Sequence, residues 1–436
     1  MGSRGDRVPA VTEGHYVSPA ECTGCVLCTR ACPTRAIRVR GNLARVDANL
    51  CTDCGFCVRV CPTGAARPAS SPPSDLKKFK YSVALPSLTL YGQFGPDVHP
   101  ALVLQALKAI GFDEAHDISW MCEMLGAATD AYLTECGGPW PKISVTCPAI
   151  VRLIQIRYPS MIPNLVPIES ARELAAKVLR RRMAQERGLD PAEIGMFFIT
   201  PCTAIVNSVV NPVGLEQSHL DGAISIADMY GPLLREIRKA GPVDTVEAFS
   251  PRGLLWAMAG GEIAGMRDAN TMTVRGVQDV EYVFDHIEAG KFQSVDFIEA
   301  YICPDGCVSG GLTVEGRYAT QRNIQRIARR LGDQTQVQEE KVRSLLKAHF
   351  FDLEEEIRAR AVKPLGEDLR SAALRKRQQM ALLSRLPGKN CAACGAPDCA
   401  TLAEDVVRGT ATLDDCVFVK IERLSSQARS SEEPTP

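Results

Sequence analysis

Short apolar runs alternate with longer segments whose apolar positions recur at helical spacing, from residue 80 to about residue 326. Runs of this length that are rich in β-branched and aromatic residues predict buried strands. They cover residues 81–85, 143–146, 196–199, 223–226, 271–274 and 295–302. Strands and helices in alternation predict an α/β domain with one or two parallel sheets.

Helix start and stop signals lie between these runs. Ser170 is followed three residues later by Glu173, which is the pattern of a capping box. Asp190 and Glu193 have the same spacing and predict a similar start. Gly290 follows a predicted helix end, where glycine readily adopts the left-handed conformation.

Three of the predicted strands end at a cysteine. Cys147, Cys202 and Cys303 each follow such a run, and Cys307 comes four residues after Cys303. Sites in open α/β sheets lie outside the carboxyl ends of strands, where helix amides favour negative charge. The turn at Cys303 is rich in residues that let a backbone bend closely around a bulky group, namely Pro304, Gly306, Gly310 and Gly311. The pattern therefore predicts that these four cysteines hold one [4Fe-4S] cubane.

Two further cysteine runs stand near the start of the chain, and each has the spacing C-x2-C-x2-C-x3-C-P. They comprise Cys22, Cys25, Cys28 and Cys32, then Cys51, Cys54, Cys57 and Cys61. In this arrangement the fourth cysteine of each run ligates the other cluster. One predicted cubane is thus bound by Cys22, Cys25, Cys28 and Cys61, and the second by Cys51, Cys54, Cys57 and Cys32. The segment resembles a bacterial two-[4Fe-4S] ferredoxin, whereas the spacing does not fit the alternative of a zinc ribbon.

A last group of four cysteines follows Pro387 and Gly388, at the spacing C-x2-C-x4-C-x16-C. It consists of Cys391, Cys394, Cys399 and Cys416, with a predicted helix over residues 401–408 that ends at Gly409. The segment resembles the small Fe-S domain of Rnf-type electron-transport subunits and corrinoid Fe-S proteins. A structural zinc knuckle is the alternative that the spacing leaves open.

Composition limits the class of protein. The chain has 436 residues, 18 cysteines, 45% apolar residues and a formal net charge of -1. Close C-x2-C spacings favour metal ligation over disulfides. The near-zero charge gives no reason to expect a nucleic-acid partner. Residues 1–13 lack the apolar core of a signal peptide, and no apolar run reaches the length of a membrane span, so a cytoplasmic protein is expected.

The predicted domains are residues 1–75, 76–325, 326–386 and 387–436. The first ends in a linker rich in Pro and Ser over residues 68–74, and the last ends in a polar tail, residues 425–436, that is expected to be disordered. The third is predicted to be a helical connection broken at Pro364. Its apolar stripe at helical spacing comprises Leu345, Leu346, Phe350, Leu353 and Ile357.

The segments around the central cysteines resemble the three cluster-binding motifs of the [FeFe]-hydrogenase large-subunit catalytic domain, in the same order, over roughly residues 80–320. They are residues 146–159, 201–204 and 303–311. The resemblance implies that Cys147, Cys202, Cys303 and Cys307 hold the cubane half of the H-cluster. It also implies that the cysteine at Cys307 bridges to a diiron unit in that family.

Four positions depart from the family pattern. Thr146 stands where the family has a proton-carrying cysteine, and a threonine hydroxyl hardly ionises in water. Ile205 replaces a lysine that holds a cyanide ligand, and Ser208 replaces a glutamate of the proton path. Leu312 replaces a third consecutive glycine. A cubane without the diiron subcluster is therefore expected.

The resulting interpretation is an iron-sulfur electron-transfer or redox-sensing protein with about four [4Fe-4S] clusters. Its expected partner is a redox protein or an oxidoreductase subunit, with a signalling protein as the alternative. A divergent, sensory [FeFe]-hydrogenase and an iron-sulfur assembly factor are the competing functions. No residue set for substrate chemistry and no phosphate-binding loop is recognised. Cys122 is expected to be a buried apolar residue, and Cys136 to lie in an exposed loop.

Overall fold

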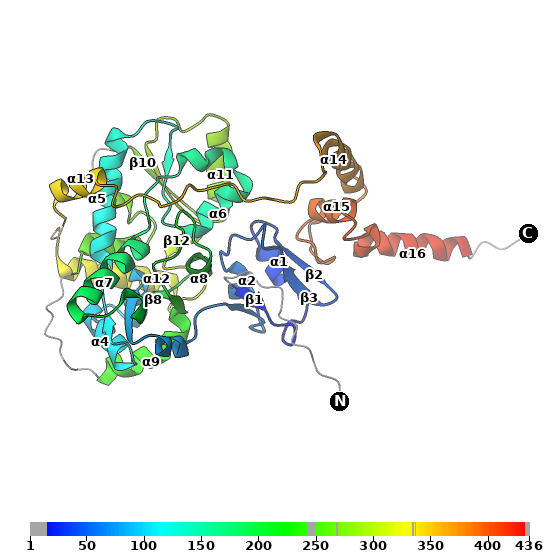
Figure 1. Ribbon diagram of the computed structural model, residues 1–436. Coiled ribbons are helices and arrows are strands. Elements are labelled where there is room, and N and C mark those ends of the chain that lie inside the picture. Colours follow the sequence, from blue (N-terminus) through cyan, green and yellow to red (C-terminus); the bar gives the residue numbers. More distant parts are fainter. Residues whose placement is uncertain are drawn as a thin grey trace, which may run out of the picture.

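The computed structural model describes residues 15–239, 241, 249–266, 269–333, 335 and 337–431. The interpretations of residues 1–13 and 432–436 fall outside this range. Figure 1 shows the arrangement: a large α/β body, the small N-terminal domain beside it, and the C-terminal helices beyond that domain. Within the described residues, no helix combines the length and apolar character needed to cross a membrane.

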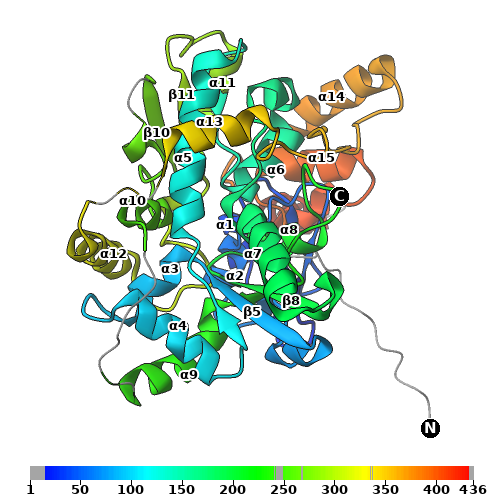
Figure 2. The same ribbon diagram turned by 60° about the vertical axis from the view of Figure 1, so that its left-hand side comes forward.

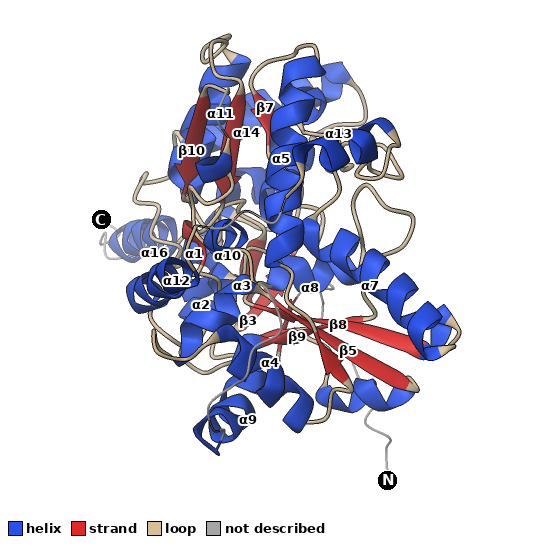
Figure 3. Cartoon of the chain, turned by 90° about the vertical axis from the view of Figure 1, so that its left-hand side faces the viewer, coloured by secondary structure: helices blue, strands red, loops and turns tan. Residues whose placement is uncertain are grey.

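Two parallel sheets form the α/β body (Figure 3). The first has the order β6 (Glu114–Ala115), β5 (Tyr81–Pro86), β8 (Ile194–Thr200) and β9 (Gly222–Ser225). The second has the order β10 (Thr271–Arg275), β11 (Phe297–Tyr301) and β7 (Lys142–Ile143). All five strand pairs in these sheets are parallel. The predicted α/β class is confirmed, although the strand expected at residues 143–146 is shorter.

Helices bury the strands because parallel strands carry apolar residues on both faces. Every residue of β8 is buried. Around the first sheet lie α4 (Pro100–Ala109), α5 (Ser119–Glu135), α7 (Ala171–Arg187) and α9 (Ile226–Lys239), with α4 and α9 side by side near β5 (Figure 2). The second sheet packs against α6 (Pro148–Arg157) and α11 (Val277–Glu288). Shorter or peripheral elements are α3 (Leu88–Tyr91), α8 (Thr203–Val210), α10 (Pro251–Leu254), β12 (Pro304–Cys307) and α12 (Arg317–Leu331).

The structure contains some of the helix-boundary features that the sequence predicts. Helix α7 begins after Ser170, but the predicted capping box is wrong, because the Glu173 carboxylate accepts hydrogen bonds from Ser218 Oγ and His219 N instead. Asp190 and Glu193 do form a capping box, around a single 3-10 turn that leads into β8. Gly290 follows the end of α11, as predicted, with a φ of 77°.

The N-terminal domain is a pair of hairpin-like ribbons with two short helices. Its elements are β1 (His15–Val17), α1 (Leu27–Ala31), β2 (Ile37–Arg40), β3 (Leu43–Val46), α2 (Phe56–Val60) and β4 (Ala66–Pro68). Strand β1 pairs with β4 and β2 pairs with β3, both antiparallel. Val17, Ile37 and Val39 contribute to the small core, together with the cysteine loops that surround it.

The connecting segments differ from expectation. The linker at residues 68–74 docks on β9, where Ser71 N donates to Ala223 O at 2.8 Å. Helix α13 (Glu339–Lys347) ends before Leu353 and Ile357, so the predicted helical stripe is wrong beyond residue 347. Irregular chain then reaches α14 (Leu369–Leu383), α15 (Cys399–Val407) and α16 (Val417–Ser431). The tail expected to be disordered is helical as far as residue 431.

Candidate iron-sulfur centres

Four strand ends bring the central cysteines together. Cys147 follows β7 and is the N-cap of α6, and Cys202 follows β8 and is the N-cap of α8. Cys303 follows β11, and Cys307 ends β12. Strands from two different sheets thus deliver thiols to one place, as the strand-cysteine pattern predicts.

Electrostatic interactions among these thiols show that they converge. Burial raises the pKa of Cys303, and charge repulsion from Cys202, Cys147 and Cys307 raises it further. Burial, with repulsion from Cys147, likewise raises the pKa of Cys202 to about 11. Buried thiols that repel each other in this way are stable as thiolates only when a metal centre compensates their charge. Their assignment as cubane ligands fits this environment and stays a prediction.

Two glycines permit the close approach of the cysteine turns. Gly306 has a φ of 80°, and a Cβ atom there would lie 2.5 Å from Ala259 N. A Cβ atom at Gly310 would lie 2.4 Å from the carbonyl oxygen of Pro201, the residue before Cys202. The Cys303 and Cys202 turns therefore fit together only with glycine at these positions.

The positions that depart from the family pattern contain no cation or carboxylate. Ile205 is buried in the core, and Ser208 Oγ donates to the carbonyl oxygen of Ile205 at 2.8 Å. Leu312 is also buried. The replacements at Ile205 and Ser208 thus stand as read from the sequence, and charged groups that the sequence analysis did not recognise reach the site from other elements.

The cation is Arg172, at the start of α7. Burial raises the pKa values of Cys147, Cys202 and Cys307, and the positive charge of Arg172 opposes this rise at each of them, which places the guanidinium near all three thiols. Its Nε atom is buried and has no hydrogen-bond partner among the described residues, while one terminal nitrogen donates to Ser208 Oγ at 3.5 Å. From the sequence, Arg172 was recognised only as part of a helix start. The one signal was an arginine near the N-terminus of a helix, where cations are normally disfavoured.

The carboxylates are Glu262 and Glu299, which are 4% and 0% exposed. Ser144 Oγ donates to Glu262 at 2.7 Å, and Thr146 Oγ1 also forms a hydrogen bond to this carboxylate. Thr273 Oγ1 donates to Glu299 at 2.9 Å. Neither glutamate was recognised from the sequence, because an isolated glutamate carries no motif.

The N-terminal domain separates its eight cysteines into the two predicted sets. A small cavity is lined by Cys22, Cys25, Cys28 and Cys61, among other residues. Cys32 instead faces the second run, where its charge raises the pKa values of Cys51, Cys54 and Cys57 after the larger effect of burial. Backbone amides also stabilise the two crossing thiolates: Ala36 N donates to Cys32 Sγ at 3.2 Å, and Ala66 N to Cys61 Sγ at 3.4 Å. This exchange of the fourth cysteine is what a two-cubane ferredoxin requires.

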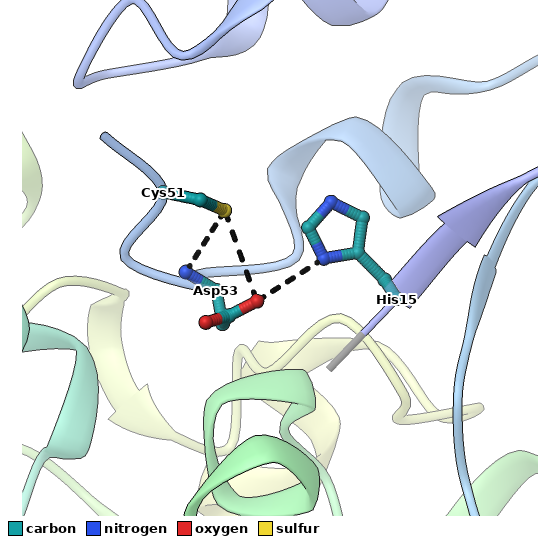
Figure 4. A group of neighbouring side chains, drawn as sticks. All are labelled: His15, Cys51 and Asp53. Atoms are coloured by element: carbon teal, nitrogen blue, oxygen red, sulfur yellow. Dashed lines mark hydrogen bonds and ion pairs between the residues drawn. The ribbon is translucent and has the colours of Figure 1, made fainter. Parts of the chain in front are cut away.

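Asp53 joins this domain to the central site. Figure 4 shows its carboxylate between His15 and Cys51, with His15 Nδ1 at 3.4 Å and Cys51 Sγ at 3.7 Å from Oδ1. The other oxygen accepts a hydrogen bond from Asn207 and lies 3.4 Å from a terminal nitrogen of Arg152. Burial raises the pKa of Asp53, but the hydrogen bond from His15 and the charge of Arg152 outweigh burial and lower it. Asp53 is therefore an ionised contact between the two domains.

His15, Cys51 and Asp53 also have the arrangement of ligands to a single metal ion. The oxygens of Asp53 are already engaged by His15, Arg152 and Asn207. Cys51 belongs to the ferredoxin run. These three residues are therefore better explained as part of the surroundings of the second cubane than as a separate site for a metal ion.

The C-terminal cysteines surround a cavity of their own. It is lined by Cys391, Cys394, Cys399 and Cys416, among other residues. Cys399 N donates to Asn390 Oδ1 at 3.0 Å, and Cys416 follows a one-turn helix that precedes α16. All four thiols come from within this domain, which fits the predicted ligand set.

The C-terminal domain contacts the ferredoxin domain through β2. Val39 N donates to Gly395 O at 2.8 Å, and Arg38 Nε lies 2.7 Å from an Asp405 oxygen. Arg40 donates to the carbonyl oxygen of Cys394. A Cβ atom at Gly395 would lie 1.8 Å from Val39 O, so the loop next to Cys394 sits directly against β2.

The two remaining cysteines lie outside these groups. Cys122 is 3% exposed and belongs to the core of the α/β body, as predicted. Cys136 is the C-cap of α5 and is half-buried rather than fully exposed.

Comparison with known families matches all three parts of the chain. Residues 80–212 and 240–311 match "Iron only hydrogenase large subunit, C-terminal domain". Residues 15–63 match "4Fe-4S dicluster domain", and residues 386–418 match "Putative Fe-S cluster". The central part of the chain therefore resembles the [FeFe]-hydrogenase large subunit, with a segment that matches a 4Fe-4S dicluster family before it and one that matches an Fe-S cluster family after it.

Individual relatives are distant. Iron hydrogenase 1 of Clostridium pasteurianum is 24% identical over 264 residues, which cover 50% of this chain and 46% of that protein. The chain thus aligns with about half the length of this relative. A variant of the [FeFe]-hydrogenase HydA1 from Chlamydomonas reinhardtii has 17% identity and a TM-score of 0.51, covering 67% of this chain and 97% of that chain. A structure of HydA(deltaEFG) has 16% identity and a TM-score of 0.49 over the same shares of the two chains. The HydA1 likeness concerns the fold alone.

Proposed function

We propose that this protein is an electron relay that carries four [4Fe-4S] cubanes, one in the C-terminal domain, two in the ferredoxin domain and one in the hydrogenase-like domain. A cubane supplies reversible one-electron transfer when it is bound. The iron-sulfur and hydrogenase-like families are consistent with a redox role of this kind.

The order of the sites along the molecule carries the proposal. The loop of Cys394 contacts Val39, which lines the cavity of Cys22, Cys25, Cys28 and Cys61. At the other end of the ferredoxin domain, Thr203 Oγ1, next to Cys202, donates to the carbonyl oxygen of Asp53. Cys54 and Phe56 pack against the core that contains Cys147 and Cys303. Each junction between domains is thus made by residues beside a cysteine site, which supports a linear order: C-terminal, first ferredoxin, second ferredoxin, central.

The surroundings of the central site support a cubane without a diiron subcluster. Ile205 and Leu312 are buried aliphatic residues at the positions where the family has a lysine and a glycine. Thr146 has no acidic proton to transfer in water. One-electron transfer by a cubane needs no residue at those positions. The proposed relay therefore requires only the cysteine ligands, and it does not require the thiol, lysine and glutamate that the hydrogenase family has near its diiron unit.

A second candidate function is hydrogen turnover by a divergent site. The observation in its favour is that Arg172 and Glu262 supply a cation and a carboxylate from new positions. Infrared absorption of iron-bound carbon monoxide and cyanide distinguishes this function from the relay.

The partner is proposed to be a redox protein or an oxidoreductase subunit that exchanges electrons at the C-terminal site. Cys391 is exposed there, whereas Cys147 and Cys303 are buried. A signalling protein that reads the redox state is the alternative partner. Binding of a low-potential ferredoxin or flavoprotein can be measured for protein with and without the cluster of the C-terminal domain. Binding that requires this cluster indicates electron exchange at the C-terminal site, and binding that does not require it indicates exchange elsewhere.

Metal analysis tests the relay directly. Anaerobically reconstituted protein is expected to contain about 16 iron atoms and about 16 acid-labile sulfides per chain, four for each cubane. A value near eight would mean that only the ferredoxin domain is metallated and would overturn the proposal. Cys303→Ser is the informative variant, because it is expected to lose one cubane while the other three remain.

A further inference from the structure

Two cavities meet at Glu262. The outer one has a volume of about 170 Å³ and opens toward solvent between α5, α13 and the loop of Glu262. The inner one has a volume of about 20 Å³ and is lined by Ser144, Thr146 and Glu169, among other residues. Glu262 and Trp256 line both cavities. A volume of the inner cavity's size holds about one water molecule when polar groups surround it.

The inner cavity has polar groups on both sides. Glu262 accepts hydrogen bonds from Ser144 and Thr146, and Thr146 directly precedes the cubane ligand Cys147. On the opposite side, Glu169 is 5% exposed, and its Oε2 atom is buried without a hydrogen-bond partner among the described residues. A buried carboxylate oxygen with no partner points to a bound water or a proton.

Glu299 completes the group on the side of β11. Its oxygens accept hydrogen bonds from Gly260 N at 2.6 Å and from Glu262 N at 3.1 Å. The backbone amide of Glu262 thus contacts the Glu299 carboxylate, and the two buried carboxyl groups repel each other, so they do not both ionise readily. The pair therefore holds one proton more easily than two separate surface glutamates would.

We propose that Glu262 and Glu299 form a proton-binding site coupled to the central iron-sulfur centre, so that at alkaline pH one proton enters from the outer cavity when one electron arrives. This inference rests on the proposed cubane at Cys147, Cys202, Cys303 and Cys307. A carboxylate oxygen of the pair forms the new O–H bond, and a hydronium ion or buffer acid in the outer cavity loses the proton. The electron comes from the adjacent ferredoxin cubane. The net charge of the buried region stays constant, which avoids the cost of adding an unpaired charge there.

The electrostatic environment sets the pH range of this coupling. Burial, followed by repulsion from Glu299, raises the pKa of Glu262 to about 8, and burial also raises the pKa of Glu299. Other titratable groups interact with the pair from neighbouring elements, and further charged groups line the outer cavity. They are Tyr301 on β11, Cys122 on α5, Cys307 on β12, and Glu123, Asp130, Arg252, Glu339 and Arg343 around the outer cavity.

An electron added nearby raises the pKa of the pair further. The midpoint potential of the central centre should therefore be constant below pH 8 and fall above it. For one proton per electron, the slope is about 59 mV per pH unit, because a tenfold change in an equilibrium constant is 59 mV for a one-electron couple.

The test is a redox titration of the reconstituted full chain between pH 6 and pH 10, followed by electron paramagnetic resonance. The central signal is identified as the one that Cys303→Ser removes. Glu262→Gln is expected to abolish the slope, and Glu262→Asp to restore part of it. Glu173→Gln is the matched control, because Glu173 is buried in the same domain but lines neither cavity, and the slope should persist. Iron content checks that each variant folds.

Infrared difference spectra of reduced minus oxidised protein give a second readout. A carbonyl band of a protonated carboxyl group should appear on reduction at pH 9 and be absent in Glu262→Gln. A potential independent of pH in the wild-type protein, or a slope unchanged in both Glu262→Gln and Glu299→Gln, would overturn the inference while leaving the relay intact. If no signal depends on Cys303, the proposed relay itself fails, and this inference fails with it.

Discussion

Charged residues near the central cysteines come from places that no motif marks. Arg172 belongs to α7, Glu262 to a loop after α10, and Glu299 to β11. Comparison of Ile205 and Ser208 with the family pattern predicted that the cation and the carboxylate were lost. Those two replacements stand, and the fold supplies other charges from elements distant along the chain.

Glu262 should make stability depend on pH. Its folded pKa, about 8, lies above the ordinary value of 4.5, mainly because of burial. The folded state therefore binds more protons than the unfolded state between these values, and the free energy of unfolding falls as pH rises through this range. Glu262→Gln removes this dependence, so the stability of the variant relative to wild type should increase from pH 6 to pH 8.5. Melting temperatures measured anaerobically at both pH values check this, and an equal difference at both would contradict it.

Arg172 should tune the central redox potential. Its charge lies near three ligand thiols and stabilises the more negative, reduced state. Arg172→Gln is expected to make the midpoint potential of the central cubane more negative, by on the order of tens of millivolts, where 59 mV is a tenfold change in the equilibrium constant. Arg172→Lys keeps the charge and should shift the potential less. Equal shifts in both variants would show that the effect is not electrostatic.

At the level of elements, β5 and β8 could be predicted because each is a largely apolar run, whereas β6 and β12, which are short and carry polar residues, were not predicted. The cysteine spacings likewise predicted the exchange of Cys32 and Cys61, because this feature is local to each run. The stripe from Leu345 to Ile357 misled the prediction. Leu353 packs on Gly214 and its backbone amide donates to Pro167 O at 3.2 Å, so tertiary contacts partly bury it outside a helix.

The contact between α8 and the second cysteine loop should control electron transfer into the central site. Gly55 has a φ of 76°, and a Cβ atom there would lie 2.7 Å from Thr203 Oγ1. Gly55→Ala should separate the loop from α8 and slow reduction of the central cubane at least several-fold, with cluster content unchanged. Rapid-freeze electron paramagnetic resonance measures this rate.

Gly64→Ala is the matched control for that variant. Gly64 has a φ of 67°, and a Cβ atom there would have no neighbour within 4 Å, so the substitution adds the same backbone strain without a steric clash. Its rate should remain close to that of the wild-type protein. A similar slowing in both variants would attribute the effect to strain in the ferredoxin domain and not to the contact with Thr203.

For the whole molecule, three families in one chain give a linear set of sites. The C-terminal domain contacts the ferredoxin domain at Val39, and the ferredoxin domain contacts the hydrogenase-like domain at Asp53 and Thr203. Spacing predicted the N-terminal and C-terminal cysteine groups, and strand ends predicted the central group, but neither predicted how the groups are ordered in space. That order depends on junctions such as Gly395 on Val39, which pair residues far apart in the sequence.

The central claim is that the hydrogenase-like domain relays electrons and carries no diiron subcluster. The most direct measurement is infrared absorption of protein expressed with hydrogenase maturation enzymes, together with a hydrogen-evolution assay using reduced viologen. We expect no bands from iron-bound carbon monoxide or cyanide and no hydrogen, although the central cubane is present. Such bands, with hydrogen evolution that Cys307→Ser abolishes, would contradict the relay.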